Sequence, residues 1–157
     1  MPSAFDELIR QHGSRIRRIA LRYASRDAVD DLVQDISVRL WRSYPSFRSD
    51  SKIETWIYQV ALNAAMTYLK TSIRERQGQA ALAAHSSRPE ATQAVSSMAD
   101  ILESFLEILG DIDAAILMMY LDGLTGDEMS RVLGISSNAV NVRVNRLKQK
   151  FSDTYVD

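Results

Sequence analysis

The sequence predicts an all-α fold, with two small helical domains joined by a flexible linker and a helix-turn-helix in the second. Apolar residues recur at steps of three and four along most of the chain, which places them on one face of successive helices. Only 3 prolines and 6 glycines interrupt the 157 residues, and no stretch alternates apolar and polar residues as a strand would. A change in composition after residue 74 predicts the division into two domains.

The first domain is expected to cover residues 1–74 and to contain three helices. Ser3 and Asp6 have the spacing of a capping box, which predicts the start of the first helix. Two further helices are predicted over residues 27–43 and 52–73, separated by a loop that contains a proline. The first helix also contains Gly13, which is expected to weaken or interrupt it, because glycine in a helix interior costs roughly 1 kcal/mol.

A linker and a second domain follow. Residues 75–97 are poor in large apolar side chains and rich in Gln, Ser and Ala, which is typical of a flexible linker. The second domain is expected to cover residues 98–157. Its helices are predicted over residues 98–109, 113–121, 126–133 and 137–152.

A helix-turn-helix near the C-terminus is the strongest motif. Thr125 and Glu128 have the spacing of a capping box for its first helix. Gly134 suits the left-handed residue that ends this helix, and Ser136 or Ser137 can cap the next one. Because the second helix of such a motif normally enters the major groove, the sequence predicts DNA binding.

The second helix of this motif has a polar face suited to reading bases. Asn and Gln pair bidentately with adenine and Arg pairs with guanine, whereas Lys suits phosphates. Arg143 lies at the edge of the face, and both a DNA contact and an ion pair with Glu128 remain open for it. A solvated face on a small helical bundle is the alternative interpretation of the whole surface. The residues expected on the face are Asn138, Asn141, Val142, Asn145, Arg146 and Gln149, with Lys148 and Lys150 placed for phosphates.

Two polar surfaces of the first domain are further candidates. Acids near the start of the second helix suit the helix dipole, and they equally suit a basic partner. Polar residues along the third helix, beside aromatic side chains, suit unstacked single-stranded bases. A solvated surface explains either pattern as well. The residues are Asp27, Asp30, Asp31, Gln34 and Asp35 on the second helix, and Gln59, Asn63, Met66 and Lys70 on the third, with Trp56 and Tyr58 nearby.

Composition argues against several classes of protein. The chain has no cysteine, which excludes disulfides and thiolate metal sites. No run of about 18 apolar residues occurs and the N-terminus lacks the layout of a signal peptide, so a cytoplasmic protein without membrane insertion is expected. His12 and His85 are far apart, and neither a phosphate loop nor an HExxH motif is present. We therefore expect no enzyme, no cofactor and no metal site.

Three segments resemble the extracytoplasmic-function group of the sigma-70 family. The family's region 2.2 helix resembles AVDDLVQDISVRLWR, and its regions 2.3 and 2.4 resemble FRSDSKIETWIYQVALNAAMTYLK. Its region 4.2 resembles the helix-turn-helix, so three motifs stand in the family's order. The resemblance implies a sigma factor that binds core RNA polymerase and promoter DNA and directs transcription initiation.

The resemblance also implies roles for individual residues. The clamp coiled coil of the largest polymerase subunit would be bound by Asp31, Gln34, Asp35, Ser37 and Trp41. The melted -10 element would be captured by Arg48, Ser49, Asp50, Ser51, Lys52, Trp56, Gln59 and Asn63. The -35 duplex would be read by Ser137, Asn138, Asn141, Arg143, Asn145 and Arg146. Relatives are often held by an anti-sigma factor between their two domains, so such a partner is expected here too.

The chain departs from the family pattern at two of these regions. Position 59 is often basic in relatives and is Gln59 here, which weakens the expected attraction to phosphates. The region near Asp113 usually contains an arginine, which puts one backbone contact in doubt.

Two other classes of protein fit parts of the sequence. A stand-alone helix-turn-helix transcriptional regulator would bind duplex DNA without polymerase, usually as a dimer, but no dimerisation helix is evident. A helical interaction module that mimics a sigma factor would bind no DNA. The presence of three motifs in order favours the sigma factor.

Overall fold

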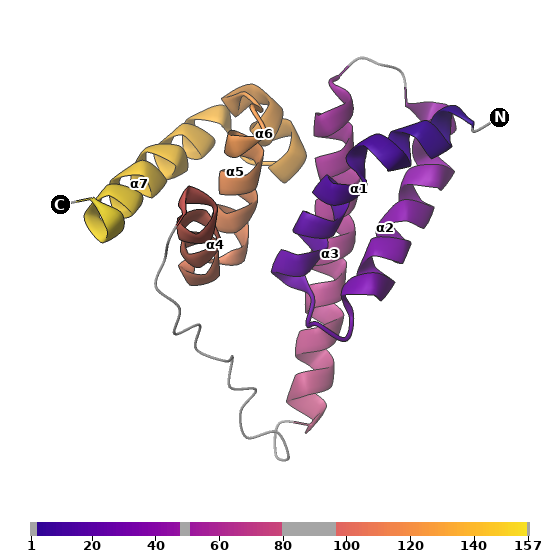
Figure 1. Ribbon diagram of the computed structural model, residues 1–157, viewed down its shortest axis with the longest axis horizontal. Helices are drawn as coiled ribbons and strands as arrows, with labels where there is room; N and C mark the ends of the chain where they lie inside the picture. The colour runs from indigo at the N-terminus through magenta and orange to yellow at the C-terminus, as the bar shows by residue number, and fades with distance from the viewer. Residues whose placement is uncertain (1–2, 48–50, 80–96, 157) are drawn as a thin grey trace.

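The computed structural model describes residues 3–47, 51–79 and 97–156, and within these ranges every regular element is a helix (Figure 1). The all-α prediction is therefore confirmed. The elements are α1 (Ala4–Tyr23), α2 (Val29–Ser43), a short 3-10 turn (Tyr44–Ser46), α3 (Ile53–Gln79), α4 (Met98–Ile108), α5 (Asp111–Leu121), α6 (Gly126–Leu133) and α7 (Ser137–Tyr155).

The first helix starts at the predicted capping box. The backbone N–H of Asp6 donates to Ser3 Oγ at 3.1 Å, and the N–H of Ser3 donates to Asp6 Oδ2 at 3.1 Å. The expected interruption at Gly13 is wrong, because α1 runs unbroken through it. Buried Leu8 and Ile16 lie on either side of the glycine, and their packing outweighs its low helix propensity.

Helices α1, α2 and α3 pack against one another as a three-helix bundle (Figure 1). On α2 the buried residues are Val29, Leu32, Ile36 and Leu40, at the steps of three and four that place apolar residues on one helix face. Helix α3 is longer than predicted and ends at Gln79 instead of residue 73. The added residues RERQGQ are mostly good helix formers, which explains why the helix continues.

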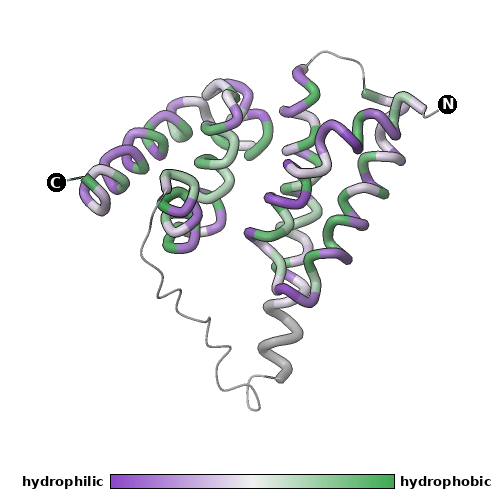
Figure 2. The backbone as a smooth tube through the Cα atoms, in the orientation of Figure 1, coloured by the Kyte–Doolittle hydropathy of each residue, from purple (hydrophilic) through white to green (hydrophobic). Residues whose placement is uncertain are grey.

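The second domain is built around α5. Six consecutive residues of this helix, Ala114 to Met119, are buried, and the helix is hydrophobic for much of its length (Figure 2). It starts at Asp111, two residues earlier than predicted, with Gly110 as its N-cap. Ile112 is 37% exposed, since the first turn of the helix is less surrounded than the middle.

The two domains pack against each other along α1 and α3 on one side and α5 and α6 on the other (Figure 1). Their buried side chains form one continuous hydrophobic cluster. Helix α3 therefore has neighbours on two sides, and Ile57, Tyr58, Ala61, Leu62, Ala64 and Ala65 are all buried.

In the described part of the chain, no helix combines the length and the apolar character needed to cross a membrane.

Candidate nucleic-acid interface

Helices α6 and α7 form the predicted helix-turn-helix. The N–H of Thr125 donates to Glu128 Oε1 at 2.7 Å and the N–H of Glu128 donates to Thr125 Oγ1 at 3.2 Å, which confirms the capping box. Gly134 ends α6 with φ of 70°, in the left-handed region that favours glycine. Ser136, and not Ser137, caps α7, because its Oγ accepts from the N–H of Ala139 at 3.0 Å.

The outer face of α7 is polar and open to solvent. Asn138, Asn141, Asn145 and Arg146 are exposed, while Val140 and Leu147 on the opposite face are buried. The exposed amides and guanidinium are free to meet base edges in a major groove. Ser137 also lies at the start of α7, but its hydroxyl already donates to Asp127 Oδ1 at 2.6 Å.

The start of α6 lies close to one of these side chains. A Cβ added at Gly126 would lie 2.8 Å from Oδ1 of Asn141, closer than side chains pack. The glycine at the first position of α6 therefore leaves the space in which the Asn141 amide sits. Because this amide is the exposed end of a flexible side chain, the close approach places it beside α6 without fixing it there.

Arg143 is bound to an acid, but not to the one considered from the sequence. Its Nη1 donates to Asp113 Oδ1 at 2.9 Å, so the interpretation with Glu128 as partner is wrong. Asp113 lies in the first turn of α5, which packs beside α7. Both side chains remain partly exposed, at 43% and 35%. The guanidinium is thus held at the edge of the α7 face by an acid of the same domain.

Glu128 instead points toward the first domain. Its carboxylate accepts from Lys52 Nζ at 3.3 Å and from Thr55 Oγ1 at 3.2 Å, both at the start of α3. The hydrogen bond from the backbone of Thr125 lowers the pKa of Glu128, burial opposes this, and the side chains of Thr125, Lys52 and Thr55 add to the lowering. We call Thr125, Glu128, Lys52 and Thr55 the Glu128 network. Glu128 therefore caps the first helix of the helix-turn-helix and also joins the second domain to the first.

The start of α3 carries the residues expected at the -10 element. Arg48, Ser49 and Asp50 lie outside the described residues. Of the remainder, Lys52, Gln59 and Asn63 are exposed, and Ser51 and Trp56 are half-buried.

Aromatic side chains surround Trp56. Its ring stacks on Phe47 with centroids 4.8 Å apart and lies 6.1 Å from the ring of Tyr44. Tyr58 was expected to add aromatic surface here, but it is fully buried. The expectation failed because the second domain covers that side of α3.

Helix α2 carries the residues expected to bind polymerase. Asp31, Gln34, Asp35 and Trp41 are exposed, and Trp41 is 63% exposed, which is unusual for so large an apolar ring. Ser37 donates its hydroxyl to the carbonyl of Val33 in its own helix at 2.8 Å. In Figure 1, α2 lies on the side of the first domain away from α4–α7.

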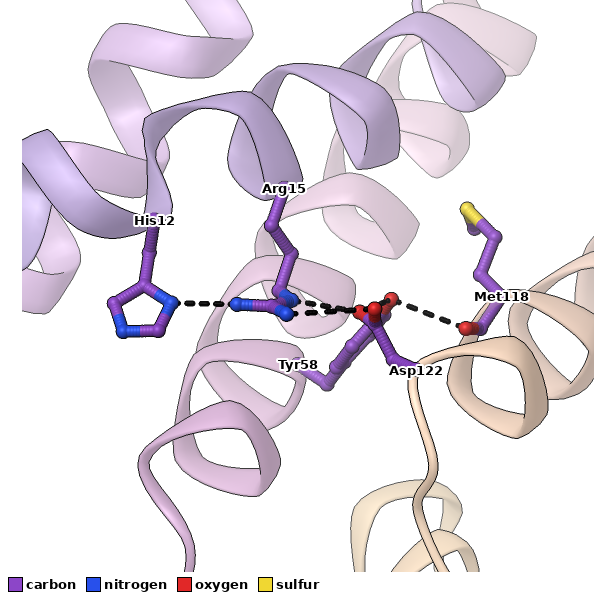
Figure 3. Close-up of polar contacts among 5 residues, drawn as sticks. All are labelled: His12, Arg15, Tyr58, Met118 and Asp122. Atoms are coloured by element: carbon purple, nitrogen blue, oxygen red, sulfur yellow. Dashed lines mark hydrogen bonds and ion pairs between the residues drawn. The ribbon is translucent and has the colours of Figure 1, made fainter.

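A second polar network joins the two domains (Figure 3). Arg15 Nε on α1 donates to Asp122 Oδ2 at 2.6 Å, and the Tyr58 hydroxyl on α3 donates to the same oxygen at 2.6 Å. Arg15 Nη1 also donates to His12 Nδ1 at 2.5 Å, so His12 accepts there as a neutral ring. We call His12, Arg15, Tyr58 and Asp122 the Asp122 network.

The environment of the Asp122 network keeps its groups in defined charge states. Burial alone would raise the pKa of Asp122, but the hydrogen bonds from Arg15 and Tyr58 outweigh it and the pKa is lowered. Burial, with the positive charge of Arg15, lowers the pKa of His12. For Tyr58, burial has the opposite effect and raises the pKa, so the hydroxyl keeps its proton and remains a donor. No local pattern in the sequence points to this network, because its partners come from distant segments.

The second domain also carries an apolar groove between α4, α5 and α7. Its volume is about 370 Å³. The side chains that line it are Met98, Leu102, Phe105, Ile116, Leu117, Tyr120, Leu121, Val144, Leu147, Lys148 and Phe151. Several of these apolar side chains reach solvent, with Met98 61% and Leu121 52% exposed. Such a groove can accept the apolar face of a helix from another protein.

Comparisons with known proteins agree with both halves of this arrangement. Residues 8–75 match the family model of Sigma-70 region 2, and residues 100–151 match that of Sigma-70, region 4. The ECF RNA polymerase sigma-E factors of Haemophilus influenzae and Escherichia coli are 25% and 26% identical to the chain. Each alignment covers 93% of this chain, and 84% and 83% of the relatives.

Solved structures share the fold. The sigma factor RpoE from Bartonella quintana, in complex with the anti-sigma factor NepR, aligns with a TM-score of 0.78 at 19% identity, over 95% of this chain and 94% of that chain. CnrH, in complex with the cytosolic domain of CnrY, aligns with a TM-score of 0.63 at 23% identity, over 96% and 86% of the two chains. The all-helical arrangement of both domains is therefore shared with these proteins.

Proposed function

Since the chain belongs to the sigma-70 family, in its extracytoplasmic-function group, we propose that it directs core RNA polymerase to promoters by holding polymerase with α2 and DNA with α3 and α7. Its part in initiation is recruitment and recognition, not chemistry, and it works in the cytoplasm without a cofactor. The proposal divides the chain into a region 2 domain (residues 1–74), a linker (75–97) and a region 4 domain (98–157).

Polymerase docking is assigned to the exposed face of α2. Asp31, Gln34, Asp35 and Trp41 combine acids, an amide and a solvent-exposed indole on one helix. Aromatic side chains are typical centres of protein interfaces, and acids around one favour a basic partner. The partner proposed from the family resemblance is the clamp coiled coil of the largest subunit.

Promoter recognition is divided between the two domains. The start of α3, with Lys52, Trp56, Gln59 and Asn63, is assigned to the melted -10 element, where an aromatic ring and polar groups suit unstacked bases. The exposed face of α7 is assigned to the -35 duplex, where each bidentate pair contributes about 1–3 kcal/mol of discrimination. With a net charge of -1, the free chain gains little from general attraction to phosphates. Tight DNA binding is therefore expected only with polymerase.

The observation that carries the proposal is the exposed face of α7, with three Asn and one Arg, which follows a region 2 bundle in the same chain. The test is in vitro transcription with core polymerase and a selected promoter library. A transcript that depends on the protein supports the proposal. Tight duplex binding without polymerase, and no transcript, would instead identify a stand-alone helix-turn-helix regulator.

Asn141→Ala is the sharper variant for this test. Loss of a bidentate amide is expected to change the base preference at one -35 position by about 10-fold. Ser152→Ala, an exposed change on the same helix beyond the proposed contacts, is the matched control and leaves the preference unaltered. An identical promoter profile for Asn141→Ala and the wild type would remove Asn141 from the reading face.

We also propose an anti-sigma factor as a regulator. The proposal is supported by the two solved relatives, whose structures are complexes with NepR and with CnrY. The apolar groove between α4, α5 and α7 suits a helix of such a partner. Purification of the protein from its native cells, followed by identification of bound proteins, tests this, and a chain that is never found with a partner would count against it.

A further inference from the structure

One apolar side chain stands on the otherwise polar outer face of α7. Val142 is 39% exposed, and in the described part of the chain it is not among the side chains that pack against the hydrophobic core. An α-helix turns by about 100° per residue, so Val142 lies about 160° around the helix from the fully buried Val140. Its neighbours one turn away, Asn138, Asn145 and Arg146, are all exposed. The valine therefore occupies the centre of the face assigned to the -35 duplex.

The residues before and after Val142 lie beside other helices of the same domain. The amide of Asn141 lies beside Gly126 at the start of α6, and the guanidinium of Arg143 donates to Asp113 of α5 at 2.9 Å. These two side chains therefore form the flanks of the α7 face. Val142 lies between the flanks, and its side chain is directed away from the domain. A helix that presents this face to a major groove brings Val142 toward the base edges rather than toward the phosphates.

Folding gives no reason for a valine at this place. A β-branched side chain loses rotamer freedom in a helix, so valine has a lower helix propensity than alanine, arginine or glutamine. Since Val142 lies outside the core, it contributes little buried apolar surface to the free protein. A lone valine is also a poor centre for a protein interface, where tryptophan, tyrosine and arginine carry most of the binding energy. A contact with nucleic acid explains the side chain better.

Thymine is the base that offers an apolar group in the major groove. It exposes its C5-methyl group there, whereas guanine, adenine and cytosine present hydrogen-bond donors and acceptors. A valine pressed against those polar groups would remove their water and leave them without partners, which costs free energy. Against a methyl group it makes an apolar contact without this cost. The exposed amides of Asn138 and Asn145 suit adenine, so the neighbours of the valine favour the same kind of base pair.

We propose that Val142 is a specificity-determining residue, which selects an A·T pair in the -35 element by packing on the C5-methyl group of a thymine. The inference rests on the proposed function, because it needs α7 in the major groove of that element. It goes beyond the residues assigned to the -35 duplex above, which are all polar. Because the contact involves no phosphate, it acts on sequence preference and not on general attraction to DNA.

Replacing thymidine by deoxyuridine tests the contact, because uracil lacks the methyl group and keeps every hydrogen-bonding group of thymine. Selection from a duplex library, by the full-length protein bound to core polymerase and by the protein alone at low salt, first gives the preferred -35 sequence. Each thymidine of that sequence is then replaced in turn, and the affinity is measured by competition. At one position, loss of the methyl group should lower the affinity about fourfold, which is the change expected for one buried carbon group.

Val142→Ala should remove this dependence on the methyl group, so that the variant binds the duplexes with thymidine and with deoxyuridine equally well. Alanine is the better helix former, so the melting temperature should be no lower than that of the wild type. The dependence of affinity on salt concentration should not change, because no phosphate contact is lost. Val156→Ala is the matched control, since it makes the same change at a valine that is 58% exposed just after α7. It should keep the full fourfold effect.

The inference is wrong if the preferred -35 sequence contains no thymine, if no replacement changes the affinity, or if Val142→Ala keeps the dependence on the methyl group. A variant that binds core polymerase or another protein more weakly, with its DNA preference unaltered, would place Val142 in a protein interface instead. Normal transcription without a methyl effect overturns this inference and leaves the proposed function standing. A methyl effect without any transcription does the reverse, because α7 then reads DNA in a stand-alone regulator. If no duplex is bound at all, both proposals fail.

Discussion

Helices α2 and α3 belong to the same bundle and carry the two predicted binding faces of the first domain, but their surroundings differ. On α2 the acids and Trp41 face solvent. On α3 the second domain covers one side, burying Tyr58 and engaging Lys52 and Thr55 through Glu128. The α2 face is therefore open to solvent, whereas part of α3 is already occupied by a contact inside the chain.

The largest expected effect concerns the α2 face. Asp31→Arg combined with Asp35→Arg places two positive charges where a basic partner is expected, and affinity for core polymerase should fall about 100-fold or more, because like charges across an interface cost several kcal/mol. Fluorescence anisotropy of labelled protein titrated with core polymerase measures this.

The double variant should keep its fold. The ion pair of Asp35 with Arg39 is exposed and contributes less than about 1 kcal/mol. Asp153→Arg, on α7, controls for charge alone. Unchanged affinity in the double variant would remove α2 from the docking face.

A smaller effect is expected at Glu128. Glu128→Ala removes one half of the capping box and the acceptor of Lys52 and Thr55, which should lower the free energy of unfolding by about 2 kcal/mol. Thr125→Ala disturbs the same cap but leaves the contacts to α3, so it should cost only about 1 kcal/mol. Chemical denaturation measures both. Equal losses would mean that Glu128 acts as a cap and adds nothing to the interface.

Thr55→Val tests a single bond between the domains. The buried hydroxyl of Thr55 donates to Glu128, and its loss with nearly conserved shape should cost about 1 kcal/mol. Thr67→Val is the control on the same helix, because the exposed Thr67 hydroxyl bonds only the carbonyl of Asn63 in the contacts described, and it should change stability by less than about 0.5 kcal/mol. Thermal melting compares the two. A similar cost for both would argue against the Glu128 network.

The smallest expected effect is a pH dependence through His12. Burial and Arg15 lower its pKa below the usual 6.5, so the unfolded chain binds the proton more readily. Neutral His12 thus contributes stability that is complete above about pH 6.5 and is lost as the pH falls below it. Arg15 on α1, Glu54 on α3 and Asp122 after α5 are the charges that act on the ring.

Melting temperatures between pH 8 and pH 5.5 measure this dependence. Asp122, whose pKa is also lowered, loses its contribution only below about pH 4, so the two windows are separate. In the His12→Gln variant, the melting temperature should depend less on pH between pH 8 and pH 5.5 than it does in the wild type. If the melting temperature of that variant changes with pH as steeply as that of the wild type, the pH dependence comes from other groups.

Much of the fold could be predicted because its signals are local. The capping boxes of α1 and α6 and the left-handed Gly134 depend on residues within a few positions of one another. The exposed polar face of α7 follows from the same periodicity that identifies its buried residues. The functional assignments of these residues remain predictions, because a polar face alone does not reveal its ligand.

The interface between the domains could not be predicted in this way. Arg15 and Asp122 are 107 positions apart, and Tyr58 and Asp122 are 64 apart, so no spacing rule relates them. The spacing of Ile53, Trp56, Ile57, Val60, Ala64 and Tyr68 predicts one buried stripe on α3, and Tyr58 lies outside it although it is fully buried. Because α3 borders two groups of helices, its buried surface is wider than a single stripe.

Because α3 packs both within its own bundle and against the second domain, it also affects how the protein unfolds. Each domain is small enough to have little stability alone, and the two have a common hydrophobic cluster. Calorimetry of the free protein should therefore record one cooperative transition in which calorimetric and van't Hoff enthalpies agree. A variant in which the second domain no longer packs on α3 is expected to become two smaller folding units, each with less buried surface to keep it folded.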